Sequence, residues 1–257
     1  MIKVTLWLLF LAFLCYLVFC LVLYFQQRSI IYYPTGQANS IEAQTIWLEH
    51  ESQRLKIWHV EGSGDRALIY FGGNAEDVSI NLVQFKSWFP DYSLYLLNYR
   101  GYGGSSGSPS EAALYSDSIA LYELVRKRHD NISVLGRSLG TGVAVYLASE
   151  KEVSGLILVT PYSSMAELGA HYYPLIPVKT LIKDRFESSK RAAAIEVPTL
   201  CLVAEYDEVI PRAISDKLVR SFAPEHVQSI VITKTSHNSI DTNPEYGKKL
   251  RTFMDRL

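Results

Sequence analysis

The chain begins with an apolar run, from Val4 to Phe25, that contains no charged residue. As a helix, this run would extend about 33 Å, which matches the hydrocarbon core of a bilayer at about 30 Å. Trp7 and Tyr24 lie near its two ends, where interfacial aromatic residues are common. A cleaved signal peptide would have a shorter apolar region and a small-residue cleavage site, and residues 24–28 provide no such site. We therefore expect residues 1–27 to form an uncleaved single-pass membrane anchor.

The flanking charges do not favour either orientation of this anchor. Lys3 and the amino terminus stand on one side, and Arg28 stands on the other. Since orientation follows the excess of Lys and Arg in the flanking segments, a near tie gives no preference. The side of the membrane that holds the rest of the chain is left open.

Beyond a short polar linker at 33–40, apolar stretches of strand and helix character alternate. Residues 45–49 and 55–60 read as an initial hairpin-like pair of strands. Further strands are predicted at 67–71, 93–97, 132–135, 155–160, 199–204 and 228–232, and helices at 75–88, 110–128, 141–149, 212–222 and 244–256. Strands separated by helices imply right-handed crossovers, so residues 28–257 are expected to form an α/β domain with a mostly parallel sheet and helices on both faces. In such sheets, the loops at the carboxyl ends of the strands build the site.

Composition narrows the possible functions. With 25 basic and 26 acidic residues, the net charge is -1, which argues against a nucleic-acid partner. Three cysteines cannot form a disulfide framework, and Cys201 sits in a strand-like run where a small buried side chain is expected. No CxxC or HExxH motif occurs, so we expect neither a metal nor a cofactor.

The strongest chemical signal is the sequence Gly136-Arg137-Ser138-Leu139-Gly140, which matches G-x-S-x-G. An apolar strand precedes it and a helix rich in small residues follows it. This is the strand–elbow–helix setting that exposes a nucleophile on a strained turn. The alternative is a glycine-rich turn with a serine that has no chemical role. We take Ser138 as the candidate nucleophile.

A serine hydroxyl needs a base, and the base needs an orienting acid. Of the six histidines, His237 alone follows the last predicted strand, which is the place of the base in a Ser…Asp…His order. The loop after the 199–204 strand offers Glu205, Asp207 and Glu208. Asp207 is preferred because it lies in the middle of the loop, whereas Glu205 is expected at the strand end and Glu208 at the cap of the next helix.

Acyl transfer also needs two backbone donors for the oxyanion. One is expected from Leu139, which follows the nucleophile, and the other from the turn after the 67–71 strand. In that turn, the paired glycines Gly72 and Gly73 allow a peptide to face inward, and the N–H of Asn74 is the natural donor. The alternative role for Asn74 is a helix N-cap, which would use its side chain and could coexist with the first.

Taken together, these motifs resemble the α/β-hydrolase superfamily, and most closely its small membrane-anchored serine hydrolases. The resemblance spans residues 28–257 and rests on YFGGNAED (70–77), NYRGYGGSSG (98–107), GRSLG, Asp207 before Val-Ile-Pro, and Ser-His-Asn at 236–238, with RSIIYYP (28–34) after the apolar segment. The chain departs from many relatives in having Gly72 where they carry His. This branch includes esterases, peptidase-like proteins and protein depalmitoylases, so membership does not name the substrate.

Residues 161–197 form the only predicted insert long enough for a cap. Its first half, around Tyr172 and Tyr173, is apolar and aromatic, whereas its second half is charged. The insert could be a lid that presents these aromatics to an acyl chain or to the bilayer surface. The sequence favours the plainer interpretation, a short helical cap that packs its aromatics on the sheet. Tyr102 and Tyr162 are candidate pocket residues, and Arg100 is expected to pair internally.

The sequence thus predicts a membrane-tethered serine hydrolase that cleaves a carboxylic ester or thioester of a small-molecule or acylated substrate, with Ser138, Asp207 and His237 as catalytic residues. A peptidase acting on short peptides is the alternative with the same fold. It would need an acidic subsite for the amino terminus of the peptide, and no obvious Glu pair marks one. A non-catalytic binding protein is the alternative from another class, but a scaffold has no need of an intact Ser, Asp and His.

Overall fold

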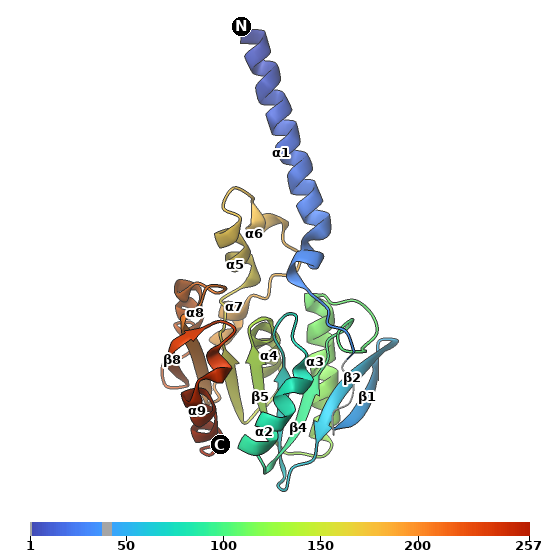
Figure 1. The fold of residues 1–257 in the computed structure, drawn as a ribbon, viewed down its shortest axis with the longest axis vertical. Coiled ribbons are helices and arrows are strands. Elements are labelled where there is room, and N and C mark those ends of the chain that lie inside the picture. Colours follow the sequence, from blue (N-terminus) through green and yellow to red (C-terminus); the bar gives the residue numbers. More distant parts are fainter. Residues whose placement is uncertain (1, 38–42) are drawn as a thin grey trace.

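The computed structural model of the chain describes residues 2–37 and 43–257, so residues 38–40 of the expected linker lie outside the described part. An eight-stranded sheet forms the centre of the molecule, in the order β1-β2-β4-β3-β5-β6-β7-β8 (Figure 1). Its strands are β1 (Gln44–His50), β2 (Gln53–Val60), β3 (Arg66–Phe71), β4 (Tyr92–Leu97), β5 (Asn131–Arg137), β6 (Gly155–Val159), β7 (Thr199–Tyr206) and β8 (Val227–Ser236). The first two pairings, β1 with β2 and β2 with β4, are antiparallel and the others are parallel. The expected hairpin and mostly parallel sheet are confirmed.

Helices cover both faces of the sheet. Those of the domain are α2 (Leu82–Trp88), α3 (Glu111–Arg126), α4 (Leu139–Glu150), α8 (Arg212–Val219) and α9 (Pro244–Met254). One buried cluster joins the sheet to α3, α4 and α8, and a second joins the opposite face to α2 and α9. Strands buried on both faces explain the continuous apolar runs of the sequence, since a parallel sheet with helices on each side exposes neither face. The result is a three-layer α/β fold.

The predicted helix at 75–88 is shorter in the structure. A loop continues to Asp77, a 3-10 turn η1 (Val78–Asn81) follows, and α2 occupies only Leu82–Trp88. Asp77 ends the loop because its Oδ1 accepts from the N–H of Ser79 at 3.1 Å. The apolar stripe of the sequence is real, with Leu82 and Phe85 buried, but side-chain capping delays the start of the regular helix.

Three short helices, α5 (Met165–Tyr172), α6 (Val178–Leu181) and α7 (Ser188–Ala192), lie between β6 and β7. They make up the insert expected at 161–197. A long helix, α1 (Ile2–Ile31), projects from the domain on the side of α5 and α6 (Figure 1). Most of α1 is exposed, and Cys20 is the only residue of this helix that is buried in the described structure.

Candidate active site

Ser138 lies between the end of β5 and the start of α4, in the middle of the sheet. Its φ of 48° and ψ of -116° place a non-glycine residue in a left-handed, strained conformation. The Ser138 N–H donates to the Val159 carbonyl at 2.9 Å, and its own carbonyl accepts from the N–H of Thr141 at 2.9 Å. These bonds to β6 and α4 hold the sharp turn, so the expected nucleophile elbow is present.

The two glycines of the elbow are required by close packing. A Cβ on Gly136 would come within 2.4 Å of the Gly140 carbonyl oxygen. A Cβ on Gly140 would come within 2.1 Å of the Phe71 carbonyl oxygen. Because real Cβ atoms do not approach backbone oxygens so closely, only glycine lets β5, α4 and the end of β3 meet here.

The structure brings the three expected side chains together from loops that are far apart in sequence. His237 Nε2 lies 2.9 Å from Ser138 Oγ. On the other side of the ring, His237 Nδ1 lies 2.9 and 3.0 Å from the two carboxylate oxygens of Asp207. The side chains of His237 and Asp207 are 6% and 2% exposed, so their interaction is shielded from water. This geometry lets Nδ1–H donate to Asp207 and leaves Nε2 to accept from the serine.

Of the three carboxylates at the end of β7 and in the following loop, Asp207 is the one placed to orient the ring. Its Oδ1 also accepts from the N–H groups of Val209 and Ile210, at 3.0 and 2.7 Å, which fixes the carboxylate within its own loop. Glu205 lies at the end of β7, as expected, and its carboxylate accepts from the N–H of Lys234 at 2.7 Å.

Glu208 differs from the expectation. Instead of capping α8, its carboxylate accepts from the N–H of His237 at 3.2 Å, and the N-cap of α8 is Pro211. The acid loop therefore holds the base at two points, through the ring by Asp207 and through the backbone by Glu208. Sequence spacing contained no signal for this second contact, because it joins residues 29 positions apart across β8.

The turn after β3 lies against the elbow and offers a second backbone donor. Glu76 organises this turn, because its Oε2 accepts from the N–H of Gly73 at 2.6 Å and its Oε1 accepts from Tyr70 Oη at 2.6 Å. The N–H of Gly73 is thereby occupied, whereas the N–H of Asn74 has no acceptor among the described residues. Leu139 is the first residue of α4, where an N–H has no partner within the helix. Both expected oxyanion donors therefore border the same space as Ser138.

The side chain of Asn74 does not cap a helix. Its Oδ1 accepts from the N–H of Tyr33 at 2.8 Å and from Tyr102 Oη at 2.8 Å. Tyr102 thus reaches the site through Asn74 and does not line the pocket directly. Burial raises the pKa of the Tyr102 phenol above its usual value, so this residue stays a neutral donor. These contacts tie the segment after α1 to the turn after β3.

Gly72, the position where the chain departs from many relatives, is also explained by packing. A Cβ at Gly72 would come within 2.4 Å of Val78 Cγ1. The Gly72 carbonyl accepts from Tyr99 Oη at 2.9 Å. A larger residue would displace η1, so glycine is required here.

Arg137, which directly precedes Ser138, forms an ion pair with Asp241. Its Nη1 lies 3.1 Å from Asp241 Oδ2, and its side chain is 12% exposed. Burial disfavours its charge, but Glu76, Tyr70 and Asp241 outweigh burial and raise the pKa of the guanidinium. Arg137 thus pairs with Asp241, after β8, and is also favoured by the charge of Glu76, after β3.

An apolar pocket of about 470 Å³ opens from Ser138, within the range of small-molecule sites. No charged side chain lines it among the described residues. The lining comes from α1, the site loops and the cap: Leu23, Tyr24, Gln27, Ile30, Ile31, Asn74, Ser138, Leu139, Tyr162, Met165, Leu168, Gly169, Tyr172, Tyr173, Ile176, Val178, Leu181, Ile182, Val209 and Ile210.

The cap aromatics do not pack on the sheet, which corrects the interpretation favoured from sequence. Tyr172 and Tyr173 line the pocket and are 49% and 42% exposed. Tyr172 Oη donates to the carbonyls of Glu208 and Val209, at 3.0 and 2.8 Å, so the cap is joined to the acid loop. Burial and the nearby charges of Asp207 and Glu208 raise the pKa of the Tyr172 phenol. The cap is a lid over an apolar space.

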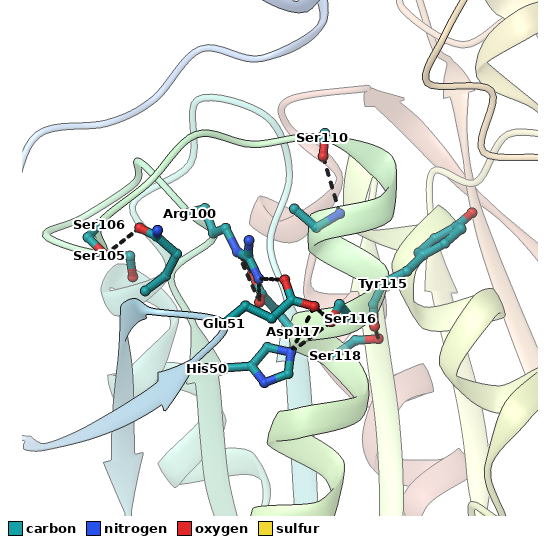
Figure 2. Close-up of polar contacts among 12 residues, drawn as sticks. His50, Glu51, Arg100, Ser105, Ser106, Ser110, Tyr115, Ser116, Asp117 and Ser118 are labelled. Atoms are coloured by element: carbon teal, nitrogen blue, oxygen red, sulfur yellow. Dashed lines mark hydrogen bonds and ion pairs between the residues drawn. The ribbon is translucent and has the colours of Figure 1, made fainter.

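Arg100 pairs internally, as expected. Figure 2 shows its guanidinium facing the carboxylates of Asp117 and Glu51, at 2.6 and 2.8 Å. Asp117 is on α3 and Glu51 lies in the turn between β1 and β2. The pair therefore fixes the β1–β2 hairpin to α3 and contributes no side chain to the pocket.

Cys201, His59 and His129 lie away from the pocket and take part in packing or in hydrogen bonds within the fold. Cys201 is fully buried in β7, and burial raises the pKa of its thiol to about 12. His59 Nδ1 and His129 Nδ1 each lie 3.0 Å from a backbone carbonyl, and His129 Nε2 lies 3.0 Å from Tyr95 Oη. Within residues 2–37 and 43–257, no group of three or more His, Cys, Asp or Glu side chains is arranged to hold a metal ion.

Comparison with known proteins identifies the family. A family model described as the alpha/beta hydrolase fold matches residues 67–186. An uncharacterised protein of Mycobacterium tuberculosis is 33% identical over 83% of this chain and 81% of its own length. Alpha/beta hydrolase domain-containing protein 17C of Xenopus tropicalis is 28% identical over 90% of this chain and 76% of its own length.

Solved structures agree on the fold. An esterase of Pyrococcus furiosus superposes with a TM-score of 0.71 over 88% of this chain and 97% of its own, at 17% identity. At that identity the likeness concerns the fold. With the family model, the sequence relatives and the elbow at Ser138, it confirms the resemblance seen in the motifs. The chain belongs to the α/β-hydrolase superfamily.

Proposed function

We propose that this protein is a membrane-tethered serine hydrolase that cleaves carboxylic esters or thioesters through an acyl-enzyme on Ser138. The observation that carries the proposal is the relay from Ser138 Oγ through His237 to the buried carboxylate of Asp207, with each contact near 2.9 Å. This arrangement stands at the inner side of an apolar pocket. A non-catalytic binding protein would have no use for a strained serine aligned with a shielded His–Asp pair.

The geometry supports a two-step acyl transfer. As Ser138 Oγ attacks the carbonyl carbon, its proton passes to His237 Nε2, and Asp207 stabilises the imidazolium that forms. The negative charge on the carbonyl oxygen is held by the N–H groups of Leu139 and Asn74. The bond to the leaving oxygen or sulfur then breaks, and His237 returns the proton to that atom. Water, deprotonated by His237, releases the acid and restores the Ser138 hydroxyl.

The pocket favours an ester or thioester with an apolar acyl group over a peptide. A peptidase for short peptides would place a carboxylate where the substrate's amino terminus binds, because a buried ammonium group needs a charged partner. No acidic residue lines the pocket among the described residues. The aromatic and aliphatic lining instead suits a chain that has no polar groups to satisfy.

The test of the chemistry is covalent labelling. Full-length protein is treated with a fluorescent fluorophosphonate, and the labelled peptide is identified by mass spectrometry. We expect one modified serine, Ser138, and loss of labelling in Ser138→Ala. Equal labelling of folded Ser138→Ala would contradict the assignment of the nucleophile.

Tethering is proposed from α1. The most apolar 18-residue stretch of this helix has a mean hydropathy of 2.9, and 6% of that stretch is buried in the structure. The helix is therefore not a core helix of the domain. Its last turn is joined to the cap by the Arg28–Asp184 pair at 3.0 Å. Cleavage of a signal peptide near Phe25 would remove most of the helix that carries Arg28. We place the anchor at 1–27 and the hydrolase domain at 28–257, with the cap at 161–197.

Carbonate extraction of membranes tests this placement. The full-length chain should remain in the pellet at high pH, because a helix spanning the bilayer is held by its apolar surface. Release into the supernatant by carbonate or high salt would show that α1 is a peripheral contact and does not span the membrane.

A further inference from the structure

The last turns of α1 form one wall of the pocket. Leu23, Tyr24, Gln27, Ile30 and Ile31 all line it. These positions are spaced at i, i+1, i+4, i+7 and i+8, so they share one face of the helix. The cap and the site loops, including Ser138, supply the rest of the lining. The segment expected to be only a tether is therefore part of the substrate pocket.

This wall is fixed to the cap by polar contacts. Gln27 Oε1 accepts from the N–H of Lys183 at 2.6 Å. Asp184, whose side chain is 4% exposed, accepts from Arg28 Nε at 3.0 Å and from Tyr32 Oη at 3.2 Å. Since a buried carboxylate is costly without its partners, these contacts hold α1 and the cap in one arrangement.

The same contacts set the level of the pocket relative to the bilayer. Lys183 Nζ lies 4.1 Å from the centre of the Tyr24 ring, at the end of the apolar run, where Tyr and Lys side chains mark the membrane surface. Farther along α1, Tyr16 Oη donates to the carbonyl of Leu175 at 2.8 Å. The tip of the cap, residues 173–175, thus lies beside Tyr16. Tyr16 is nine residues before Phe25, which is about 14 Å along the helix.

The cap tip has the surface of a segment in lipid. Leu175 is 84% exposed, and its neighbour Tyr173 is 42% exposed. Figure 1 shows α5 and α6 beside the lower part of α1, on the side of the domain from which the helix projects. A helix that spans a bilayer along residues 4–25 places these exposed apolar side chains among acyl chains, where they need no protein partner.

We propose that the anchor helix and the cap together form an acyl-binding pocket that opens into the bilayer, so that the substrate is a long-chain acyl ester or thioester already embedded in the membrane. Its chain enters between α1 and the cap, and its carbonyl reaches Ser138 near the membrane surface. This inference rests on the proposed function. Ile30, which lines the pocket and is 39% exposed, lies at the open edge between helix and cap.

The test uses full-length protein in phosphatidylcholine vesicles and two esters, p-nitrophenyl butyrate and p-nitrophenyl palmitate. Leu23→Trp fills the pocket from α1, and Leu21→Trp is its matched control. Leu21 is two residues away, about 200° around the helix, is 55% exposed and does not line the pocket. Comparing each variant with the unsubstituted protein cancels the partitioning of the esters into the vesicles.

We expect Leu23→Trp to lower the ratio of palmitate to butyrate turnover (kcat/KM) at least about tenfold, since apolar pockets discriminate by about that factor for a single methylene. Leu21→Trp should leave the ratio unchanged. Ile30→Trp, at an exposed position that also lines the pocket, should lower the ratio as Leu23→Trp does. It replaces Leu23→Trp in the test if that variant is poorly folded. An active enzyme with the same ratio in all variants overturns the inference and leaves the proposed function standing. Turnover of both esters by folded Ser138→Ala overturns the proposed function and the inference with it.

Discussion

The Ser138–His237–Asp207 relay and the apolar pocket meet at Ser138 but are built in different ways. Ser138, Asp207 and His237 come from loops at the carboxyl ends of β5, β7 and β8, and the acid and base are almost fully buried. Much of the pocket lining comes from α1 and the cap, outside the sheet, and includes Tyr172 and Tyr173, which are 49% and 42% exposed. Under the proposed function, the reaction chemistry belongs to loops at the ends of the sheet strands, whereas substrate selection belongs to α1 and the cap. Changes in the two regions should therefore affect different measurements.

The largest effect is expected at the nucleophile. Ser138→Ala should lower kcat at least about 10⁴-fold, because the remaining groups supply only oxyanion stabilisation and binding. The measurement is steady-state hydrolysis of p-nitrophenyl butyrate, with circular dichroism to verify the fold. A folded variant with normal kcat would place the chemistry elsewhere and break the comparison.

Asp207→Asn should come next, with kcat lowered by about 10⁴-fold or slightly less. The amide keeps the size of the side chain but removes the charge that fixes the tautomer of His237 and stabilises its imidazolium. The same butyrate assay measures the loss. Glu205→Gln is the control, because Glu205 contacts Lys234 and not the base. A large loss in Glu205→Gln with little change in Asp207→Asn would show that the wrong carboxylate had been chosen.

A smaller effect is expected from the second support of the base. Glu208→Ala should lower kcat about tenfold, because the His237 N–H loses its acceptor and the ring is less firmly positioned. Glu208→Gln keeps an oxygen at this position and should recover most of the activity. If Ala and Gln have equal activity, the hydrogen bond to the His237 backbone does not contribute to positioning.

The smallest effect concerns stability at the junction of anchor and cap. Arg28→Ala should reduce the free energy of unfolding by about 1 kcal/mol, since Asp184 stays buried and loses the two hydrogen bonds that Arg28 donates, keeping the one from Tyr32. In a domain of this size, Tm would fall by about 2–4 °C. Thermal unfolding of full-length protein in detergent, followed by tryptophan fluorescence, measures it.

Arg212→Ala is the matched control for that variant. The side chains of Arg28 and Arg212 are 52% and 51% exposed, but Asp184 is 4% exposed and Asp216, the partner of Arg212, is 33% exposed. Since the Arg212 pair is an exposed helical one, its loss should cost about 0.3–0.5 kcal/mol. Equal changes in Tm would indicate that α1 is not held to the cap by its buried carboxylate.

Much of the fold could be predicted because the relevant signals are local. Apolar runs of strand length alternate with helical stripes, and this pattern requires a parallel sheet covered on both faces. The elbow was also readable, because the glycines around Ser138 mark the close approach of β5 to α4. The order of serine, acid and histidine along the chain selected Asp207 and His237, and the structure places both beside Ser138.

Other features depend on contacts between distant residues. The helix expected at 75–88 begins at Leu82, because Glu76 binds the turn after β3 and Asp77 caps the 3-10 turn η1 at Ser79. Glu208 binds the backbone of His237 and does not cap α8. Periodicity could not show either contact, because a carboxylate takes whichever donor the folded chain presents.

The sequence by itself determined the α/β architecture, the serine on its elbow and the apolar first helix, since each follows from residue types at short spacing. Only the tertiary structure decided that α1 lines the apolar pocket beside Ser138. Residues 23–31 and the cap (161–197) are at least 130 positions apart. Either a membrane or a protein core would account for the apolar character of both segments. Their meeting is fixed by Asp184, whose carboxylate is buried at the junction and draws Arg28 and Tyr32 to the cap.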